Sequence, residues 1–224
     1  MMDITPEILL SAYAQGLFPM APGRESEELE WYRPRRRGVI PLHSPHIPRR
    51  LVRTVLAGRY RVCTDQNFDE VIEACSHEAS GREETWISYR IRALYGDLHR
   101  RGYAHSVEVR ADSGQLAGGL YGVALGGAFF GESMVSLERD TSKIALVHLI
   151  AALQRGGYHL LDTQFITPHL ASLGGIEIEA ARYQFLLMQA LEAEAVWGQD
   201  VSLTGLRSFI EDLRRNKAAQ EQVV

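Results

Sequence analysis

The hydrophobic and polar positions in the first half of the chain predict a series of short elements. Thr5 can cap a helix that Pro6 and Glu7 begin and that Gly16 ends. The apolar spacing further along predicts a helix over 48–57, a strand over 60–64 and a helix over 68–78 entered from Asp65 or Asn67.

The second half of the chain is more regular. Its spacing predicts a helix over 87–101, three strands over 104–110, 115–125 and 128–136, a helix from Thr141 or Ser142 to Arg155, a strand over 159–164, a helical turn over 168–173 and a helix over 179–195. Tight-turn residues at 112–114 and 126–127 separate the three strands and favour antiparallel pairing between neighbours. A meander followed by helix, strand and helix indicates an α+β fold.

Length and composition indicate a folded protein that stays in solution. The chain has 224 residues, of which 46% are hydrophobic, so it can bury a sizeable core. It shows neither the pattern of a secretory signal nor the roughly 20 apolar residues that span a bilayer. Cys63 and Cys75 alone supply neither a disulfide framework nor a thiolate zinc site. We therefore expect a cytoplasmic protein without a bound metal.

The charges are segregated along the chain. The net charge is −4, yet residues 33–61 hold nine arginines and no acid, so the remainder carries −13 (−4 minus +9). The planar fork of arginine pairs with phosphate oxygens and stacks on bases. The segment is therefore either a nucleic-acid contact surface or a solvated face balanced by acidic neighbours, and composition leaves both interpretations open.

Several short blocks of residues, in a fixed order between residues 8 and 190, carry a more specific signal. They are Ala14-Gln15-Gly16-Leu17-Phe18-Pro19-Met20, Trp31-Tyr32-Arg33-Pro34, Thr85-Trp86-Ile87, His105-Ser106-Val107-Glu108-Val109, Gly118-Gly119-Leu120-Tyr121-Gly122-Val123-Ala124, Phe130-Gly131-Glu132-Ser133-Met134, Ser142-Lys143, Leu161-Asp162-Thr163-Gln164 and His169-Leu170-Ala171-Ser172-Leu173-Gly174. Together they resemble the leucyl/phenylalanyl-tRNA–protein transferases. One block would be weak evidence because short motifs recur by chance, whereas an ordered set over most of the chain is specific.

The resemblance implies a small N-terminal domain, which we place at residues 1–64, and a C-terminal domain related to the acetyltransferase superfamily at residues 65–224. Residues 80–85 are the most linker-like stretch, so a boundary as late as 85 is the alternative. The resemblance also implies that no cofactor is used and that the donor is leucyl- or phenylalanyl-tRNA, with methionyl-tRNA as a further candidate. The acceptor would be a protein with N-terminal Arg or Lys, which the added residue marks for degradation. We expect a monomer.

Asp162, Gln164 and Glu132 are the candidate catalytic residues. An activated ester needs positioning, which can supply roughly 7–11 kcal/mol, and removal of a proton from an amine whose pKa is about 8. Asp162 and Gln164 lie two apart on a predicted strand and should share a face, and the resemblance implies that the aspartate acts through the glutamine. By resemblance, Glu132 contacts the donor amino group or orients the reacting ends. The alternatives are an Asp162 that caps a loop and a Glu132 paired with Arg139 or Lys143.

Further residues stand at positions that resemble the family's substrate contacts. An apolar pocket for the donor side chain would be lined by Leu120, Phe129, Met134, Leu146, Leu149, Leu153 and Leu161, although core packing would also bury them. Tyr32 and Trp86 offer flat faces for the terminal adenosine, or else pack between the two domains. The candidate phosphate contacts are Arg33, Arg35, Arg36, Arg37, Arg49, Arg50 and Arg53. The leucines at 149 and 153 replace aromatic residues of some relatives, which leaves the balance among leucine, phenylalanine and methionine open.

Two rival functions remain. A coenzyme A-dependent acetyltransferase would need a glycine-rich pyrophosphate loop before the helix that starts near 141, and residues 137–140 contain no glycine. A non-catalytic tRNA-binding module would need only the arginine segment. The three candidate catalytic residues in their expected blocks disfavour a chain without activity.

Overall fold

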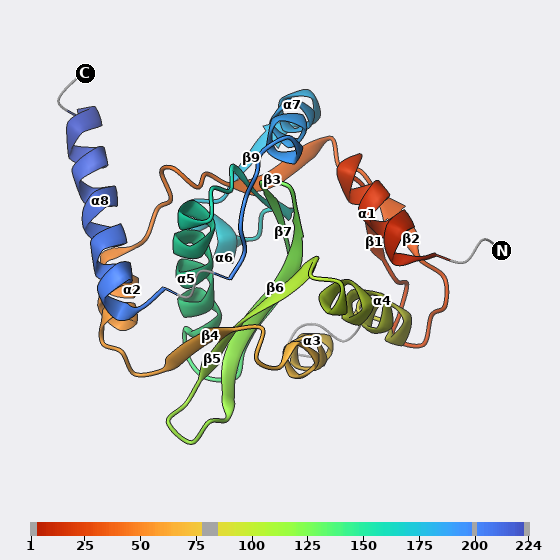
Figure 1. Ribbon diagram of the computed structural model, residues 1–224, viewed down its shortest axis with the longest axis horizontal. Helices are drawn as coiled ribbons and strands as arrows, with labels where there is room; N and C mark the ends of the chain where they lie inside the picture. The colour runs from red at the N-terminus through yellow and green to blue at the C-terminus, as the bar shows by residue number, and fades with distance from the viewer. Residues whose placement is uncertain (1–3, 78–84, 199–200, 222–224) are drawn as a thin grey trace.

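A seven-stranded mixed sheet forms the centre of the protein (Figure 1), for which a computed structural model describes residues 4–77, 85–198 and 201–221. The strand order is β4-β5-β6-β7-β8-β3-β9. Neighbouring strands are antiparallel except β7 and β8, which are parallel. The strands are β3 (Arg36–Ile40), β4 (Arg61–Thr64), β5 (Ala104–Arg110), β6 (Leu116–Leu125), β7 (Ala128–Ser136), β8 (Leu160–Gln164) and β9 (Ile176–Glu179). A separate antiparallel pair is formed by β1 (Phe18–Met20) and β2 (Glu30–Tyr32).

Helices cover both faces of the sheet and divide the core in two. The helices are α1 (Pro6–Ala14), α2 (Arg49–Leu56), α3 (Phe68–Ser76), α4 (Tyr89–Arg100), α5 (Thr141–Arg155), α6 (Pro168–Ala171), α7 (Ala180–Leu191) and α8 (Leu203–Glu221). One hydrophobic cluster joins the sheet to α2, α5 and α8, and the other joins it to α1, α3, α4 and α7. Leu161 belongs to the first cluster and Leu160 to the second, as the alternation of side chains along a strand requires.

Local signals position most helix ends. The hydroxyl of Thr5 accepts from the N–H of Ile8, and the side chain of Asn67, one of the two predicted entry residues, caps α3. The predicted cap of α5 is wrong: Asp140, in a left-handed conformation with φ of 64°, precedes the helix. The Thr141 hydroxyl instead donates to the carbonyl of Ala117 at 2.8 Å and ties α5 to β6.

The α+β arrangement predicted from the sequence is confirmed, although several elements were not expected. The strands β1, β2 and β9 are only three or four residues long, too short for their periodicity to stand out. The strand β3 is mostly buried, but it begins with Arg36 and Arg37, so its sequence lacks the hydrophobic pattern from which a strand is predicted. Because β3 and β4 pair with strands from beyond residue 65, the sheet spans both parts of the predicted division, and the boundary at 64 or 85 stays a prediction. Residues 80–84 of the linker-like stretch lie outside the described residues.

In the part of the chain that the structure describes, no helix has the length and apolar character needed to cross a membrane.

Candidate active site

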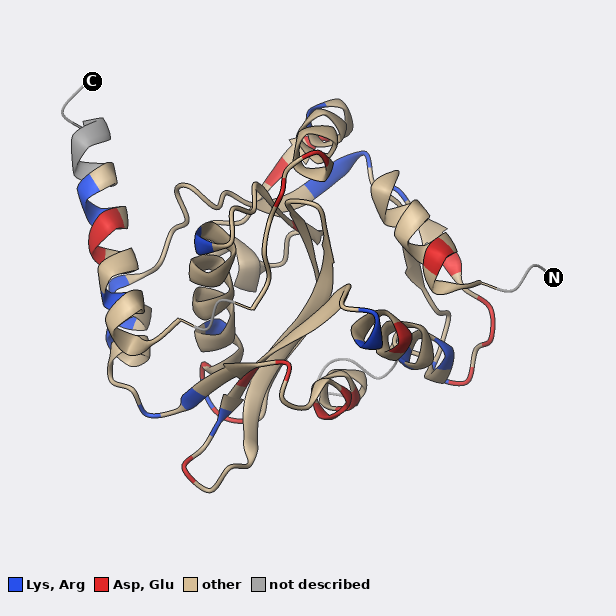
Figure 2. Ribbon diagram, in the orientation of Figure 1, with Lys and Arg blue, Asp and Glu red and all other residues tan. Residues whose placement is uncertain are grey.

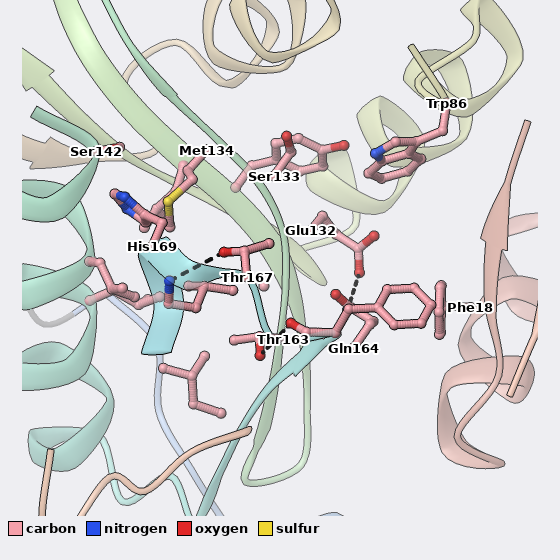
Figure 3. A pocket seen from close by; sticks show the side chains of 18 of the residues that line it. Phe18, Trp86, Glu132, Ser133, Met134, Ser142, Thr163, Gln164, Thr167 and His169 are labelled. Atoms are coloured by element: carbon pink, nitrogen blue, oxygen red, sulfur yellow. Dashed lines mark hydrogen bonds between the residues drawn. The ribbon is translucent and has the colours of Figure 1, made fainter. Parts of the chain in front are cut away.

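A cavity of about 540 Å³ opens where two parallel strands separate (Figure 3). The pairing of β7 with β8 extends only as far as Phe130 and Asp162. Beyond that point the two strands diverge, and residues 131–134 of β7 and 163–164 of β8 line the space between them. The helix α5 with Thr167, His169 and Leu170 completes one side, and Phe18, Met20 and Trp86 lie on the other. The sheet therefore creates the cavity at a break in its own hydrogen bonding.

The end of the cavity beside α5 is mostly apolar, although Ser142 and His169 also line it (Figure 3). Of the seven residues predicted for a donor pocket, five line it: Leu120, Met134, Leu146, Leu149 and Leu161. Phe129 and Leu153 do not. Phe129 is fully buried and stacks on Trp197 with ring centroids 5.3 Å apart, and Leu153 is fully buried in the core under α5. Helical spacing could group Leu153 with Leu146 and Leu149 but could not tell which of them reaches the cavity.

Glu132 lies at the polar end of the cavity because of a β-bulge. The register between β6 and β7 shifts so that Gly122 faces Gly131 and Tyr121 faces Ser133, which leaves Glu132 as the extra residue. The hydroxyls of Tyr13 and Tyr95 lie 2.7 and 3.0 Å from its two carboxylate oxygens and also bond to each other, so three contacts share the protons of the two phenols and of the carboxyl group.

The surroundings of Glu132 change its acidity. Burial raises the pKa of Glu132 from 4.5 to about 7, and the charge of Asp162 adds to this, although the two phenols act in the opposite direction. The alternative pairing of Glu132 with Arg139 or Lys143 is wrong, because both of these cations pair with Asp140. Glu132 is therefore a carboxyl group that gains and loses its proton near neutral pH.

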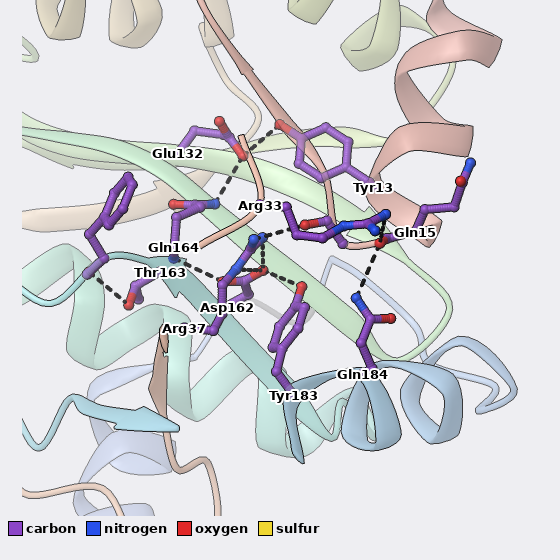
Figure 4. Close-up of polar contacts among 12 residues, drawn as sticks. Tyr13, Gln15, Arg33, Arg37, Glu132, Asp162, Thr163, Gln164, Tyr183 and Gln184 are labelled. Atoms are coloured by element: carbon purple, nitrogen blue, oxygen red, sulfur yellow. Dashed lines mark hydrogen bonds and ion pairs between the residues drawn. The ribbon is translucent and has the colours of Figure 1, made fainter. Parts of the chain in front are cut away.

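Asp162 lies behind the cavity wall and is fully buried (Figure 4). Its carboxylate accepts from the guanidinium of Arg37 at 2.7 and 2.9 Å, from the phenol of Tyr183 at 2.6 Å and from the backbone N–H of Gln164 at 2.8 Å. The alternative role as a cap is met in part, since Asp162 accepts from the backbone N–H of Gln164, but Arg37 and Tyr183 also make it part of a buried ion-pair network. The network holds the end of β8 in one position.

Gln164 has the side chain that enters the cavity. Its backbone is left-handed, with φ of 57°, a conformation that is strained for any residue with a Cβ. This conformation ends the strand alternation, so the Gln164 amide points to Glu132, 3.4 Å from Nε2 to Oε1, while Asp162 points to Arg37 and Tyr183 (Figure 4). The groups that the two side chains contact are held by α1, α4 and α7, which cover the same face of the sheet, and Asp162 and Gln164 also connect through the Gln164 backbone.

The structure separates the three consecutive arginines that were predicted to contact phosphates. Arg37 is 1% exposed, bonds to Asp162 and to the carbonyl of Gly16 at 2.9 Å, and lies between the rings of Phe18 and Tyr183. A phosphate role for Arg37 is wrong, because its guanidinium is enclosed. Arg36 is exposed but paired with two glutamates of β9, at 2.9 and 2.5 Å.

The other predicted tRNA contacts lie on the surface or at the cavity. Arg33, Arg35, Arg49, Arg50 and Arg53 are exposed. Trp86 lines the cavity. Tyr32 does not line it, but its ring stacks on the cavity residue Phe18, with centroids 5.9 Å apart. The aromatic faces thus lie at the side of the cavity opposite α5.

Several residues of the site were not singled out from the sequence. Tyr13 and Tyr95 occupy buried faces of α1 and α4, where the periodicity only suggests core packing, and Tyr183 does so on α7. No sequence signal could show that their hydroxyls reach carboxylates on β7 and β8. Among the described residues, no group of three His, Cys, Asp or Glu side chains is placed to hold a metal ion.

Two family models match most of this chain. The family model described as "Leucyl/phenylalanyl-tRNA protein transferase" matches residues 39–188, and the one described as "Leucyl/phenylalanyl-tRNA protein transferase N-terminal domain" matches residues 2–35. Among solved structures, the chain is similar to "The structure of L-PGS from Bacillus licheniformis", with a TM-score of 0.39 and 13% identity over 74% of this chain and 55% of that one. This last likeness is too distant to establish a shared fold.

Curated relatives carry the same description at much higher identity. A leucyl/phenylalanyl-tRNA–protein transferase of Gluconobacter oxydans is 60% identical over 95% of this chain and 94% of its own length. Relatives from Nitrobacter winogradskyi and Caulobacter vibrioides are 55% and 53% identical, over 88% and 90% of this chain and 87% and 93% of their own. The chain belongs to the leucyl/phenylalanyl-tRNA–protein transferase family.

Proposed function

We propose that this chain moves leucine or phenylalanine from the 3′ adenosine of a charged tRNA to the N-terminal Arg or Lys of a protein, and that the cavity is where the transfer occurs. The observation that supports this most is the division of one cavity into an apolar end and a polar end. The apolar end suits a hydrocarbon side chain, and the polar end offers Glu132 and Gln164 to the reacting groups.

The donor side chain binds at the leucine-lined end. Leucine and phenylalanine have no polar atom to recognise, so the protein must select them by size and apolar contact. Leu146 and Leu149 of α5, with Met134 and Leu161, provide such a surface. A wall of aliphatic side chains can also take an unbranched chain, which keeps methionine as a third candidate donor.

Glu132 accepts the proton of the attacking amine. The acceptor nitrogen forms the new amide bond with the ester carbonyl carbon, the bond from that carbon to the ribose oxygen breaks, and the proton lost by the amine replaces that bond on the ribose oxygen. A base whose pKa is about 7 is well matched to an α-amino group whose pKa is about 8. Tyr13 and Tyr95 hold the Glu132 carboxylate in place.

Asp162 acts as a positioning residue. It contacts no part of the cavity directly but holds the Gln164 backbone at 2.8 Å, and Arg37 and Tyr183 hold Asp162 in turn. The Gln164 amide can then orient the ester or the amine. Correct positioning of this kind is worth several kcal/mol, since a small misplacement costs about 100-fold in rate.

The tRNA meets the protein on aromatic and basic surfaces. Trp86, with Tyr32 behind Phe18, offers flat faces for the terminal adenosine. The exposed arginines predicted as phosphate contacts remain proposals, namely Arg33, Arg35, Arg49, Arg50 and Arg53, and Arg36 would first have to leave its two glutamates.

The proposal also includes four assignments about the whole chain: its superfamily, its division into domains, its location in the cell and its oligomeric state. The C-terminal part is related to the acetyltransferase superfamily, and the chain divides near residue 64 or as late as 85. The protein is cytoplasmic and works as a monomer. The antiparallel β5-β6-β7 meander followed by α5 and β8 supports the first of these.

The test is transfer of labelled leucine, phenylalanine and methionine from charged tRNA to a peptide that begins with arginine, with a matched peptide that begins with alanine. Transfer to the arginine peptide alone is expected, with leucine or phenylalanine as the best donor. Binding of tRNA without transfer from any donor would favour a non-catalytic module. Binding of coenzyme A and acetyl transfer would favour the acetyltransferase alternative.

A further inference from the structure

We propose that the C-terminal helix α8 forms one tRNA-binding surface together with α2, in which Arg207 and Arg214 contact phosphates of the tRNA body. The inference rests on the proposed function, because it assumes that the donor is a tRNA. It concerns a helix outside residues 2–35 and 39–188, the parts of the chain that the family models match.

The two helices are fixed side by side. Leu206, Phe209 and Ile210 of α8 are buried in the same cluster as Leu51 and Val55 of α2. At the start of α8, the Cβ position of Gly205 would lie 2.8 Å from Nη1 of Arg155, at the end of α5. Because the buried side of α8 faces the body of the protein, its outer residues and those of α2 belong to one margin of the molecule, where Figure 2 shows Lys and Arg on both helices.

The arginines of α8 share one flank of the helix. Arg207 and Arg214 are seven residues apart, about two helical turns, so they point in the same direction. Both are exposed. Arg215, by contrast, points about 100° away and pairs with Asp212 on its own helix. Glu211 lies on the same flank, four residues after Arg207 and three before Arg214, but no ion pair joins it to either arginine, so the flank keeps a net positive charge.

Exposed arginines are concentrated on α2 and α8. Elsewhere, some exposed arginines are joined to acids, as Arg36 is to Glu177 and Arg100 is to Asp97, and others, such as Arg59 and Arg61, are not. Within the described residues, the guanidinium groups on α2 and α8 that have no hydrogen-bond or ion-pair partner are those of Arg49, Arg50, Arg53, Arg207 and Arg214, although the charge of Arg50 also acts on the carboxylate of Asp140. In a chain with a net charge of −4, such a group of exposed cations is what a polyanion requires.

The location fits a tRNA whose end enters the cavity. The helix α2 packs against α5, and α5 contributes Leu146 and Leu149 to the cavity wall. A duplex resting on α2 and α8 would thus be one helix away from the site at which its 3′ end reacts. Phosphate is the group recognised, because arginine forks on a solvated helix offer charge but no pocket for a base.

The experiment compares transfer from aminoacyl-tRNA with transfer from aminoacyl-adenosine in the same set of variants. The double variant Arg207→Gln/Arg214→Gln should raise the Kd for tRNA by roughly tenfold and reduce the slope of log Kd against log salt by about two units, one for each lost phosphate contact. The KM for aminoacyl-tRNA should rise in parallel while kcat at saturation stays unchanged. Transfer from aminoacyl-adenosine, which has no tRNA body, should be unaffected.

Arg215→Gln is the matched control, since it removes the same charge from the same helix at a position already paired with Asp212. It should leave Kd and the salt slope within twofold of the starting protein. Unchanged tRNA affinity in the double variant, or an equal loss with Arg215→Gln, would overturn the inference. A starting protein that transfers from neither donor would instead contradict the proposed function itself.

Discussion

The two ends of the cavity are built in opposite ways. The apolar end is lined by leucines from a helix and two strands, and no polar partner fixes any of them. At the polar end, Glu132 and Gln164, with Asp162 behind them, are held by hydrogen bonds from α1, α4, α7 and β3. Because of this difference, we expect one substitution at the apolar end to change which donor is preferred. The transfer reaction, by contrast, depends on a hydrogen-bond network assembled from distant parts of the chain.

The largest effect is expected for Asp162→Ala. It removes the support of Gln164 and leaves the buried Arg37 charge unpaired. We expect kcat to fall about 1000-fold and the free energy of unfolding to fall by about 3–5 kcal/mol, while the folded variant keeps its tRNA affinity. Denaturant unfolding and single-turnover transfer measure the two effects.

The double variant Arg37→Met/Asp162→Leu separates the two roles of Asp162. Replacing both charges by apolar groups should restore most of the stability and none of the activity. Normal turnover by Asp162→Ala, or recovery of turnover by the double variant, would remove Asp162 from the mechanism.

The next largest effect is expected for Glu132→Gln, which cannot take a proton. We expect kcat to fall about 100-fold. In the starting protein the Glu132 carboxyl is protonated below its pKa of about 7, so kcat should rise as pH increases through 7, and the glutamine variant should lose this step.

Tyr13→Phe tests the same role of Glu132 by changing the pKa of its carboxyl group. The Tyr13 hydroxyl stabilises the ionised carboxylate, so its removal should raise the pKa of Glu132 and move the step in kcat to higher pH. A pH profile that is identical in all three proteins would show that Glu132 does not accept the proton.

A smaller effect is expected for Trp86→Ala, which removes a flat face from the cavity. Loss of stacking worth about 1–3 kcal/mol per base should raise the KM for aminoacyl-tRNA by roughly tenfold, with little change in kcat. Trp31→Ala is the control, because Trp31 is exposed and does not line the cavity. Equal effects of the two substitutions would point to general surface binding.

The smallest effect is expected for Leu149→Trp, which narrows the apolar end. Transfer of phenylalanine should fall more than transfer of leucine, changing the ratio of their kcat/KM by about tenfold. Leu153→Met, on the same helix but buried away from the cavity, should leave that ratio unchanged. An unchanged ratio in Leu149→Trp would place the donor side chain elsewhere.

The sequence predicted the elements that have strong local signals and missed those that depend on distant contacts. The Thr5 cap and the long meander strands were predicted because each is encoded within a few residues. The strand β3 was missed because it exists only between β8 and β9.

The site shows the same limit. Glu132, Asp162 and Gln164 could be named from their blocks, but Arg37 was assigned to the surface because its charge resembled that of its neighbours Arg35 and Arg36. Only the pairing of β3 with β8 brings its guanidinium onto Asp162. Tyr13 and Tyr95 were missed for a related reason. The spacing of residues along a helix shows that a side chain is buried, but it does not show which group a buried hydroxyl contacts.

The most direct test of the central claim, that the two ends of the cavity perform separate tasks, is the ratio of leucine to phenylalanine transfer in Glu132→Gln. The account predicts that kcat/KM falls for both donors by the same factor, so that the ratio stays within twofold of the starting protein. A ratio that changes as much as the rate does would contradict it, because the carboxylate would then take part in choosing the donor.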